Sequence, residues 1–188
     1  MTFRGWICVG FAVALLTAIG CSSNSADPVP PAPAIACSDG GAAPANGVTL
    51  TCGGTAGTTK ENVNVVMGGA AAGSTTLRGL NFDVTYEPAK LEFVPASAYT
   101  SPLFPGALVA VTLEGGLPGR VVVSIQQPGG VLDVTVLAGQ HDVLSLSFQR
   151  ASGVSFGPTP VAFDLSASEA TAASAPIAFL GSLALSYQ

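Results

Sequence analysis

The sequence predicts an all-β protein in which two antiparallel sheets close over a shared core. Apolar and polar residues alternate along many short segments, which is the period of a strand with one wet face. Twenty-three glycines and fourteen prolines are spread over the chain, as expected of closely spaced turns. No stretch shows a helical period with comparable clarity. These observations favour an antiparallel β-sandwich of about nine strands.

The clearest strand spans residues 76–86 and ends in a turn. Apolar side chains alternate there with polar ones, namely Leu80, Phe82, Val84 and Tyr86 with Asn81, Asp83 and Thr85. Pro88 has a fixed φ and no N–H, so the chain must turn before the alternation resumes at Leu91 and Phe93. We expect the apolar set in the core and the polar set on an exposed or partner-facing sheet surface, together with Ser145 and Ser147.

The remaining strands are placed by the turn signals between them. They are predicted at residues 63–67, 91–94, 107–114, 120–126, 131–137, 143–149, 161–165 and 177–187, the last with a break at Gly181-Ser182. Residues 68–75 are expected to form a loop. The alanine-rich residues 166–175 are expected to form another, with at most one helical turn.

Residues 1–20 have the composition of an export signal. Arg4 precedes an apolar stretch at residues 6–16, and small residues precede Cys21. The sequence LTAIGC at residues 16–21 resembles a bacterial lipobox, whose cysteine is acylated and becomes the mature N-terminus. We expect a lipid on Cys21 that holds the protein at the outer membrane. The alternative is a conventional signal peptide cut nearby, which leaves Cys21 as an ordinary thiol.

Residues 21–59 are predicted to form a lipidated tether that includes a disulfide loop, ahead of a folded domain at residues 60–188. Serines and four prolines between residues 22 and 35 favour an extended spacer. Cys8 lies inside the signal and Cys21 carries the lipid, so Cys37 and Cys52 are the remaining pair in an oxidising compartment. We therefore expect a disulfide between Cys37 and Cys52.

The segments FDVTYEPAKLEFV at residues 82–94 and HDVLSLSFQRASG at residues 141–153 together resemble the cohesin family. The resemblance spans roughly residues 61–188. It implies a jelly-roll-like sandwich of nine strands that binds another protein and has no catalytic role. In the family the partner is a dockerin, a small calcium-loaded helical module held on a sheet face. Individual recognition residues do not carry over, and a different surface protein remains an alternative partner.

Charge and hydropathy exclude two classes of function. Charged residues make up 9% of the chain, and the net charge is -5 without a basic run. Nucleic acid is therefore a poor partner, because phosphate binding depends on clustered Lys and Arg. After the N-terminal stretch, no apolar run approaches the ~20 residues that a membrane-spanning helix needs. The lipid is the expected link to the membrane.

Two patterns that suggest catalysis lack the context that catalysis requires. Residues 153–157 match G-x-S-x-G around Ser155, the spacing of a nucleophile elbow. Pro158, Pro160 and another strand follow it in place of a helix, and the single histidine, His141, precedes it. His141 and Asp142 are neighbours on a predicted turn, so their side chains point in different directions. We predict no enzyme activity.

No cofactor or metal site is predicted either. Structural zinc needs four ligands, and Cys37 and Cys52 have no histidine nearby. No loop follows the D-x-[DN]-x-[DN]-G pattern of calcium-binding loops. Acidic residues such as Glu87, Asp133 and Asp164 are candidates for acid-base work by type only, because nothing in the sequence brings two of them together.

Polysaccharide binding is the alternative function, because cellulose-binding sandwiches resemble cohesins in fold. The single tryptophan, Trp6, is lost with the signal, which disfavours a flat sugar platform. Tyr99 and Phe104 lie in a predicted loop, and they are the aromatic side chains expected to reach solvent and a sugar. The other candidates fall on the apolar phase of strands and are expected in the core: Phe82, Phe93, Phe148, Phe163 and Phe179.

Overall fold

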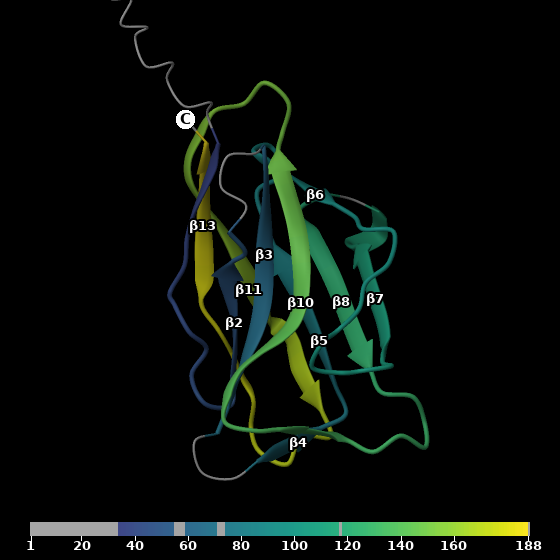
Figure 1. The fold of residues 1–188 in the computed structure, drawn as a ribbon. Coiled ribbons are helices and arrows are strands. Elements are labelled where there is room, and N and C mark those ends of the chain that lie inside the picture. Colours follow the sequence, from purple (N-terminus) through teal and green to yellow (C-terminus); the bar gives the residue numbers. More distant parts are fainter. Residues whose placement is uncertain (1–33, 55–58, 71–73, 117, 188) are drawn as a thin grey trace, which may run out of the picture. The chain divides into compact units, whose positions relative to one another are not determined.

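Thirteen strands form two facing sheets and a short ribbon in the computed structural model, which describes residues 34–54, 59–70, 74–116 and 118–187. The six-stranded sheet has the order β1-β13-β11-β5-β8-β7, and the five-stranded sheet has the order β12-β2-β3-β10-β6. Figure 1 shows β3 and β10 in front of β5 and β8. Neighbouring strands are antiparallel except for β12 and β2. The predicted antiparallel sandwich is confirmed.

The bounds of the elements follow the alternating segments of the sequence. The six-stranded sheet contains β1 (Ile35–Ser38), β5 (Gly79–Thr85), β7 (Leu108–Leu113), β8 (Arg120–Gln126), β11 (Phe156–Thr171) and β13 (Ser182–Tyr187). The five-stranded sheet contains β2 (Gly47–Cys52), β3 (Lys60–Gly69), β6 (Leu91–Val94), β10 (Gly139–Arg150) and β12 (Ala178–Leu180). The ribbon pairs β4 (Thr75–Leu77) with β9 (Val134–Val136), and one 3-10 turn, η1, spans Glu114–Gly116. None of the described segments forms a helix long and apolar enough to span a membrane.

The core lies between the two sheets and is filled by the apolar phase of the strands. Phe82, Leu146 and Phe148 are each at most 1% exposed. The ring of Tyr86 meets Phe148 edge-on, with 5.3 Å between centroids. The five aromatic side chains predicted for the core are all buried, as predicted: Phe82, Phe93, Phe148, Phe163 and Phe179. The phase assigned to these strands is therefore confirmed.

The sandwich begins earlier in the chain than the predicted boundary at Lys60. β1 pairs with β13, and β2 pairs with β3 and β12, so residues assigned to the tether supply one strand to each sheet. The prediction of a tether is wrong for these strands, because their apolar side chains pack into the core. The predicted Cys37–Cys52 disulfide is confirmed, and it links β1 to β2 with 5.8 Å between the two Cα atoms. Residues 1–33, with the predicted signal peptide, Cys21 and spacer, lie outside the described residues.

Three further segments test the predicted strand bounds. β11 continues to Thr171 through residues predicted as a loop, and its register with β5 shifts between Asp164 and Glu169. Such an irregularity lets a strand absorb extra residues without ending. Segment 131–137 is a strand only over Val134–Val136, and Leu132 is 87% exposed. The break near Gly181 is confirmed, because β12 and β13 belong to different sheets.

Candidate functional site

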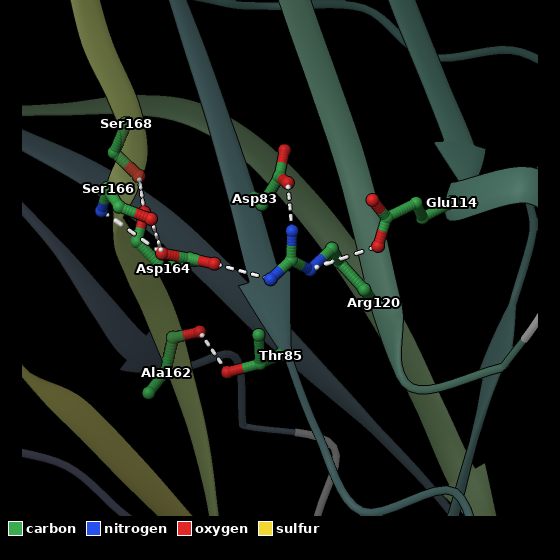
Figure 2. A network of polar contacts seen from close by, with 8 residues as sticks. All are labelled: Asp83, Thr85, Glu114, Arg120, Ala162, Asp164, Ser166 and Ser168. Carbon is green, nitrogen blue, oxygen red and sulfur yellow. Dashed lines mark hydrogen bonds and ion pairs between the residues drawn. The ribbon is translucent and has the colours of Figure 1, made fainter.

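A cluster of charged side chains lies on the outer face of the six-stranded sheet. Arg120, the first residue of β8, contacts three carboxylates: Asp83 on β5, Glu114 in η1 and Asp164 on β11 (Figure 2). Arg120 Nη1 lies 3.3 Å from Asp83 Oδ2, and Nε lies 3.2 Å from Glu114 Oε2. Arg120 Nη2 donates to Asp164 Oδ2. Negative groups outnumber the one guanidinium, so this part of the face is acidic.

The strand register explains why these four side chains meet. Asp83 takes the outward phase of β5 and lies opposite Asp164 on β11. Arg120 lies opposite Thr85 on β5, one outward position from Asp83. The β7–β8 hairpin pairs Leu113 with Val121, which brings Glu114 and Arg120 together beside its turn. Three separate strand pairings therefore assemble the cluster.

The two aspartates of this cluster have opposite electrostatic environments. Asp83 is 8% exposed. Burial raises the pKa of Asp83 above its ordinary value of 3.8, and the charges of Glu114 and Asp164 add to this, while Arg120 opposes it. Hydrogen bonds from the hydroxyl and the backbone N–H of Ser166 lower the pKa of Asp164 below 3.8. Asp164 therefore keeps its negative charge to lower pH than Asp83 does.

A second set of hydrogen bonds continues along the same face. Asn81 Nδ2 donates to Glu169 Oε1 at 3.2 Å, and Asn81 Oδ1 accepts the Ser124 hydroxyl at 2.8 Å. Gln126 Nε2 donates to Thr171 Oγ1 at 3.0 Å. These bonds link β5, β8 and β11, so the polar side chains are held in fixed positions across three strands. We call this surface the charged face. It consists of the outward side chains of β8, from Arg120 to Gln126, and the side chains bonded to them.

The predicted contact residues are divided between this face and a loop. Asn81, Asp83 and Thr85 lie on the charged face, where Thr85 Oγ1 donates to the Ala162 carbonyl at 3.2 Å. Tyr99 and Phe104 lie in the loop between β6 and β7. Phe104 is 1% exposed, so the prediction that it reaches solvent is wrong; the loop directs its ring into the core. Tyr99 is half-buried against the core, and its hydroxyl accepts the Ala96 N–H at 2.9 Å.

Sequence reasoning did not single out Arg120 or Glu114. A usable signal was present, because the strands predicted at residues 107–114 and 120–126 are joined by a short segment, which brings Glu114 and Arg120 to adjoining strand ends. Asp164 was considered only as an acid by type, and its approach to Asp83 depends on the pairing of β5 with β11. That pairing joins residues about eighty positions apart in the chain, such as Asp83 and Asp164, and no local sequence pattern predicts it.

The residues considered for catalysis lie in different parts of the molecule. Ser155 is exposed, and it is followed in the chain by strand β11 in place of the helix that a nucleophile elbow requires. His141 lies on β10 of the other sheet, where its Nε2 is 2.9 Å from the Leu137 carbonyl oxygen. Within the described ranges, no group of three or more His, Cys, Asp or Glu side chains is placed to hold a metal ion.

Comparison with known proteins identifies the fold. Neither a protein-family model nor a curated protein matches the sequence. A chain from a crystallised complex of CaCohA2, of Clostridium acetobutylicum, with a variant of CaDoc0917 matches at a TM-score of 0.50 and 15% identity, over 71% of this chain and 95% of that one. The third cohesin ScaC from Acetivibrio cellulolyticus, in complex with the ScaB dockerin, matches at a TM-score of 0.50 and 11% identity, over 72% and 94%. The chain therefore has a cohesin-like fold.

Proposed function

We propose that this chain is a non-catalytic module that binds another protein through the charged face. The observation that carries the proposal is the fixed position of the polar side chains around Arg120 and Asn81. Side chains that are already ordered lose little entropy on binding, and fixed charges select one partner over others. The similar structure from Acetivibrio cellulolyticus is a cohesin in complex with a dockerin, which supports a protein as the ligand.

The chemistry of the charged face defines the partner it fits. Three carboxylates surround one guanidinium, so a partner with basic side chains at its docking surface is complementary. Leu108 lies opposite Gln126 and is 69% exposed, which adds an apolar contact at the side of the face. A small helical module of the dockerin kind meets both requirements if it carries basic and apolar residues on one side. A different protein of the cell envelope is the alternative.

Paired arginine substitutions on the two outer faces test this proposal. Val122 on β8 lies between Arg120 and Ser124 on the outward phase of the charged face, whereas Ser145 on β10 is exposed on the five-stranded sheet. A partner is captured from the cell envelope, identified, purified and titrated by calorimetry, alongside purified calcium-loaded dockerins. We expect Val122→Arg to weaken binding by about tenfold or more and Ser145→Arg to leave it unchanged. Equal effects of both changes would refute docking on the charged face.

We also propose that the module is displayed at the cell envelope by a lipid on Cys21. The Cys37–Cys52 disulfide supports an oxidising, exported location. Replacing Cys21 by serine should move the protein from the membrane fraction to the soluble fraction, because the acyl chains that anchor it are then absent. Mass spectrometry of the mature N-terminus supplies the independent measurement. A membrane-bound Cys21→Ser protein, or a mature N-terminus without acyl chains, would refute the lipid anchor.

A further inference from the structure

The edge strand β7 differs from the other edges of the two main sheets. It has six residues, whereas β1 and β6 have four each and β12 has three. The sequence of β7, LVAVTL, contains neither a charge nor a proline, while β6 carries Glu92 and is followed by Pro95. Exposed edges are usually short or marked by charge or proline, because a long neutral edge is a template for another strand.

The backbone of β7 has hydrogen-bonding groups left over on its free side. Alternate residues of an antiparallel edge strand direct their N–H and C=O groups away from the one neighbour they have. Among the described residues, no backbone hydrogen bond joins Leu108–Leu113 to any segment except β8. A further extended strand would satisfy these groups.

The inward side chains of β7 are also incompletely covered. Val109, Val111 and Leu113 pack against the core but remain half-buried. The inward residues of the β6 edge, Leu91 and Phe93, are 0% and 5% exposed. The sandwich is therefore less well closed along β7, and an added strand would remove apolar surface from water there.

We propose that β7 pairs antiparallel with β7 of a second copy of this chain and continues the six-stranded sheet across a twofold axis. The chain has a net charge of -5, and β7 is a stretch along which two copies meet no like charge. Glu114 follows β7 directly, and the antiparallel direction carries the two Glu114 side chains to opposite ends of the pair. The same patch meets itself, so the contact closes as a dimer and does not propagate.

The alternation of β7 restricts the position of the axis. Directly opposed residues of an antiparallel pair place their side chains on the same face. In a continuous sheet, one residue near the middle of β7 must therefore lie directly opposite its own copy, with the axis midway between them. That residue is Ala110 or Val111. With the axis at Ala110, Leu108 lies opposite Thr112 of the second copy, and both are exposed. With the axis at Val111, the half-buried Val109 and Leu113 face each other.

Self-cross-linking of single cysteine variants tests this geometry. We expect mild oxidation of the purified full-length protein to link Ala110→Cys or Val111→Cys into a dimer, because the axis places one of these residues opposite itself. Leu108→Cys is the matched control, since Leu108 is exposed near the start of β7 and either position of the axis separates its two copies by several residues. The unsubstituted protein controls for the native cysteines. Linkage at Leu108→Cys as efficient as at both central positions would overturn the proposal.

Sedimentation equilibrium supplies the second measurement. We expect the protein to form dimers as its concentration rises. Ala110→Lys should weaken dimerisation at least about tenfold, because the two lysines then lie either directly opposite each other or at diagonal positions across the strand pair. Ala36→Lys, an exposed position on the β1 edge, should leave dimerisation unchanged. A protein that stays monomeric at every concentration refutes the dimer and would leave the β7 edge to an extended segment of another protein. A dimer that survives Ala110→Lys also refutes it.

Discussion

The outer faces of the two sheets differ in charge more than in polarity. On the six-stranded sheet, Arg120 holds Asp83, Glu114 and Asp164 in one cluster. In the middle of the five-stranded sheet, where β3 pairs with β10, the outward side chains are amides and hydroxyls, namely Asn62, Asn64, Ser145 and Ser147. Ser147 Oγ donates there to Asn62 Oδ1 at 2.7 Å. We call this second surface the neutral face.

The difference shows that solubility alone does not account for the charged face. On the neutral face, amide and hydroxyl side chains make the surface hydrophilic without forming an ion pair among themselves. Partly exposed ion pairs such as those of Arg120 contribute little net stability, because desolvation and ordering offset most of the attraction. A cluster that stabilises weakly but fixes charge in place is better suited to recognition than to folding. The two faces should therefore respond differently to substitution, salt and pH.

The largest effect is expected from Leu146→Ala, which tests the phase of β10 that defines the neutral face. Leu146 is 0% exposed, and removing its side chain leaves a cavity that should cost ~2–5 kcal/mol of unfolding free energy. Ser145→Ala, one residue away on the exposed side, should stay within about 0.5 kcal/mol. Denaturant unfolding measures both. Similar losses at the two positions would mean that β10 has no distinct inner and outer side.

The next effect concerns the link between the two sheets. The disulfide joins Cys37 in the six-stranded sheet to Cys52 in the five-stranded sheet across a sequence separation of 15. Replacing both cysteines by serine should cost about 3 kcal/mol, because the unfolded chain regains the entropy of an open loop. Thermal unfolding of the double variant, compared with the reduced and oxidised native protein, gives the measurement. An unchanged melting temperature would show that β1 and β2 hold without their cross-link.

The sequence predicted the strands with alternating side chains and missed those in atypical surroundings. Phe82, Leu146 and Phe148 alternate with polar residues over several positions, and their burial follows from the period alone. β1 and β2 lie among glycines, prolines and asparagines, a composition that favours a linker. Val48 and Leu50 alternate with polar residues, but the alternation covers too few positions to predict a strand against a composition that favours a linker. The disulfide was predictable because it depends on which cysteines remain, not on strand pairing.

The charged face was predictable only in part. The period of β5 placed Asn81, Asp83 and Thr85 on one side of a strand, which the structure bears out. The neighbours of these residues come from β8 and β11, and such long-range pairing depends on the packing of the whole sheet. The prediction that Phe104 reaches solvent was wrong for a related reason. A loop has no regular period, so the sequence does not show which of its side chains point into the core.

A smaller effect is expected from Arg120→Met, which removes the cation of the charged face and keeps much of the side-chain volume. Asp83 then loses its positive partner while 8% exposed, and the three carboxylates repel one another. We expect a loss of about 1–2 kcal/mol, below that of a fully buried pair because the Arg120 side chain is 33% exposed. Added salt should reduce the loss by screening the repulsion. Ser147→Ala on the neutral face is the control, and its effect should not depend on salt.

The smallest effect separates the two aspartates by pH. Because the folded-state pKa of Asp164 is lowered, its contribution to stability is present above 3.8 and is lost as the pH falls through the lowered value. The raised pKa of Asp83 acts in the opposite direction: the stability gained by its protonation is complete below 3.8 and is lost as the pH rises through the raised value. At neutral pH, Asp164→Asn should therefore lower the melting temperature, whereas Asp83→Asn should raise it slightly.

Melting temperatures measured from neutral pH down to below 3.8 distinguish these outcomes. The effect of Asp83→Asn should vanish first as the solution is acidified, because the native carboxyl becomes neutral and then resembles the amide. The effect of Asp164→Asn should persist to lower pH, because Ser166 keeps that carboxylate ionised. Parallel profiles for the two variants would mean that the burial of Asp83 and the hydrogen bonds from Ser166 to Asp164 do not separate the pKa values of the two carboxyl groups. The two aspartates of the charged face would then be electrostatically equivalent.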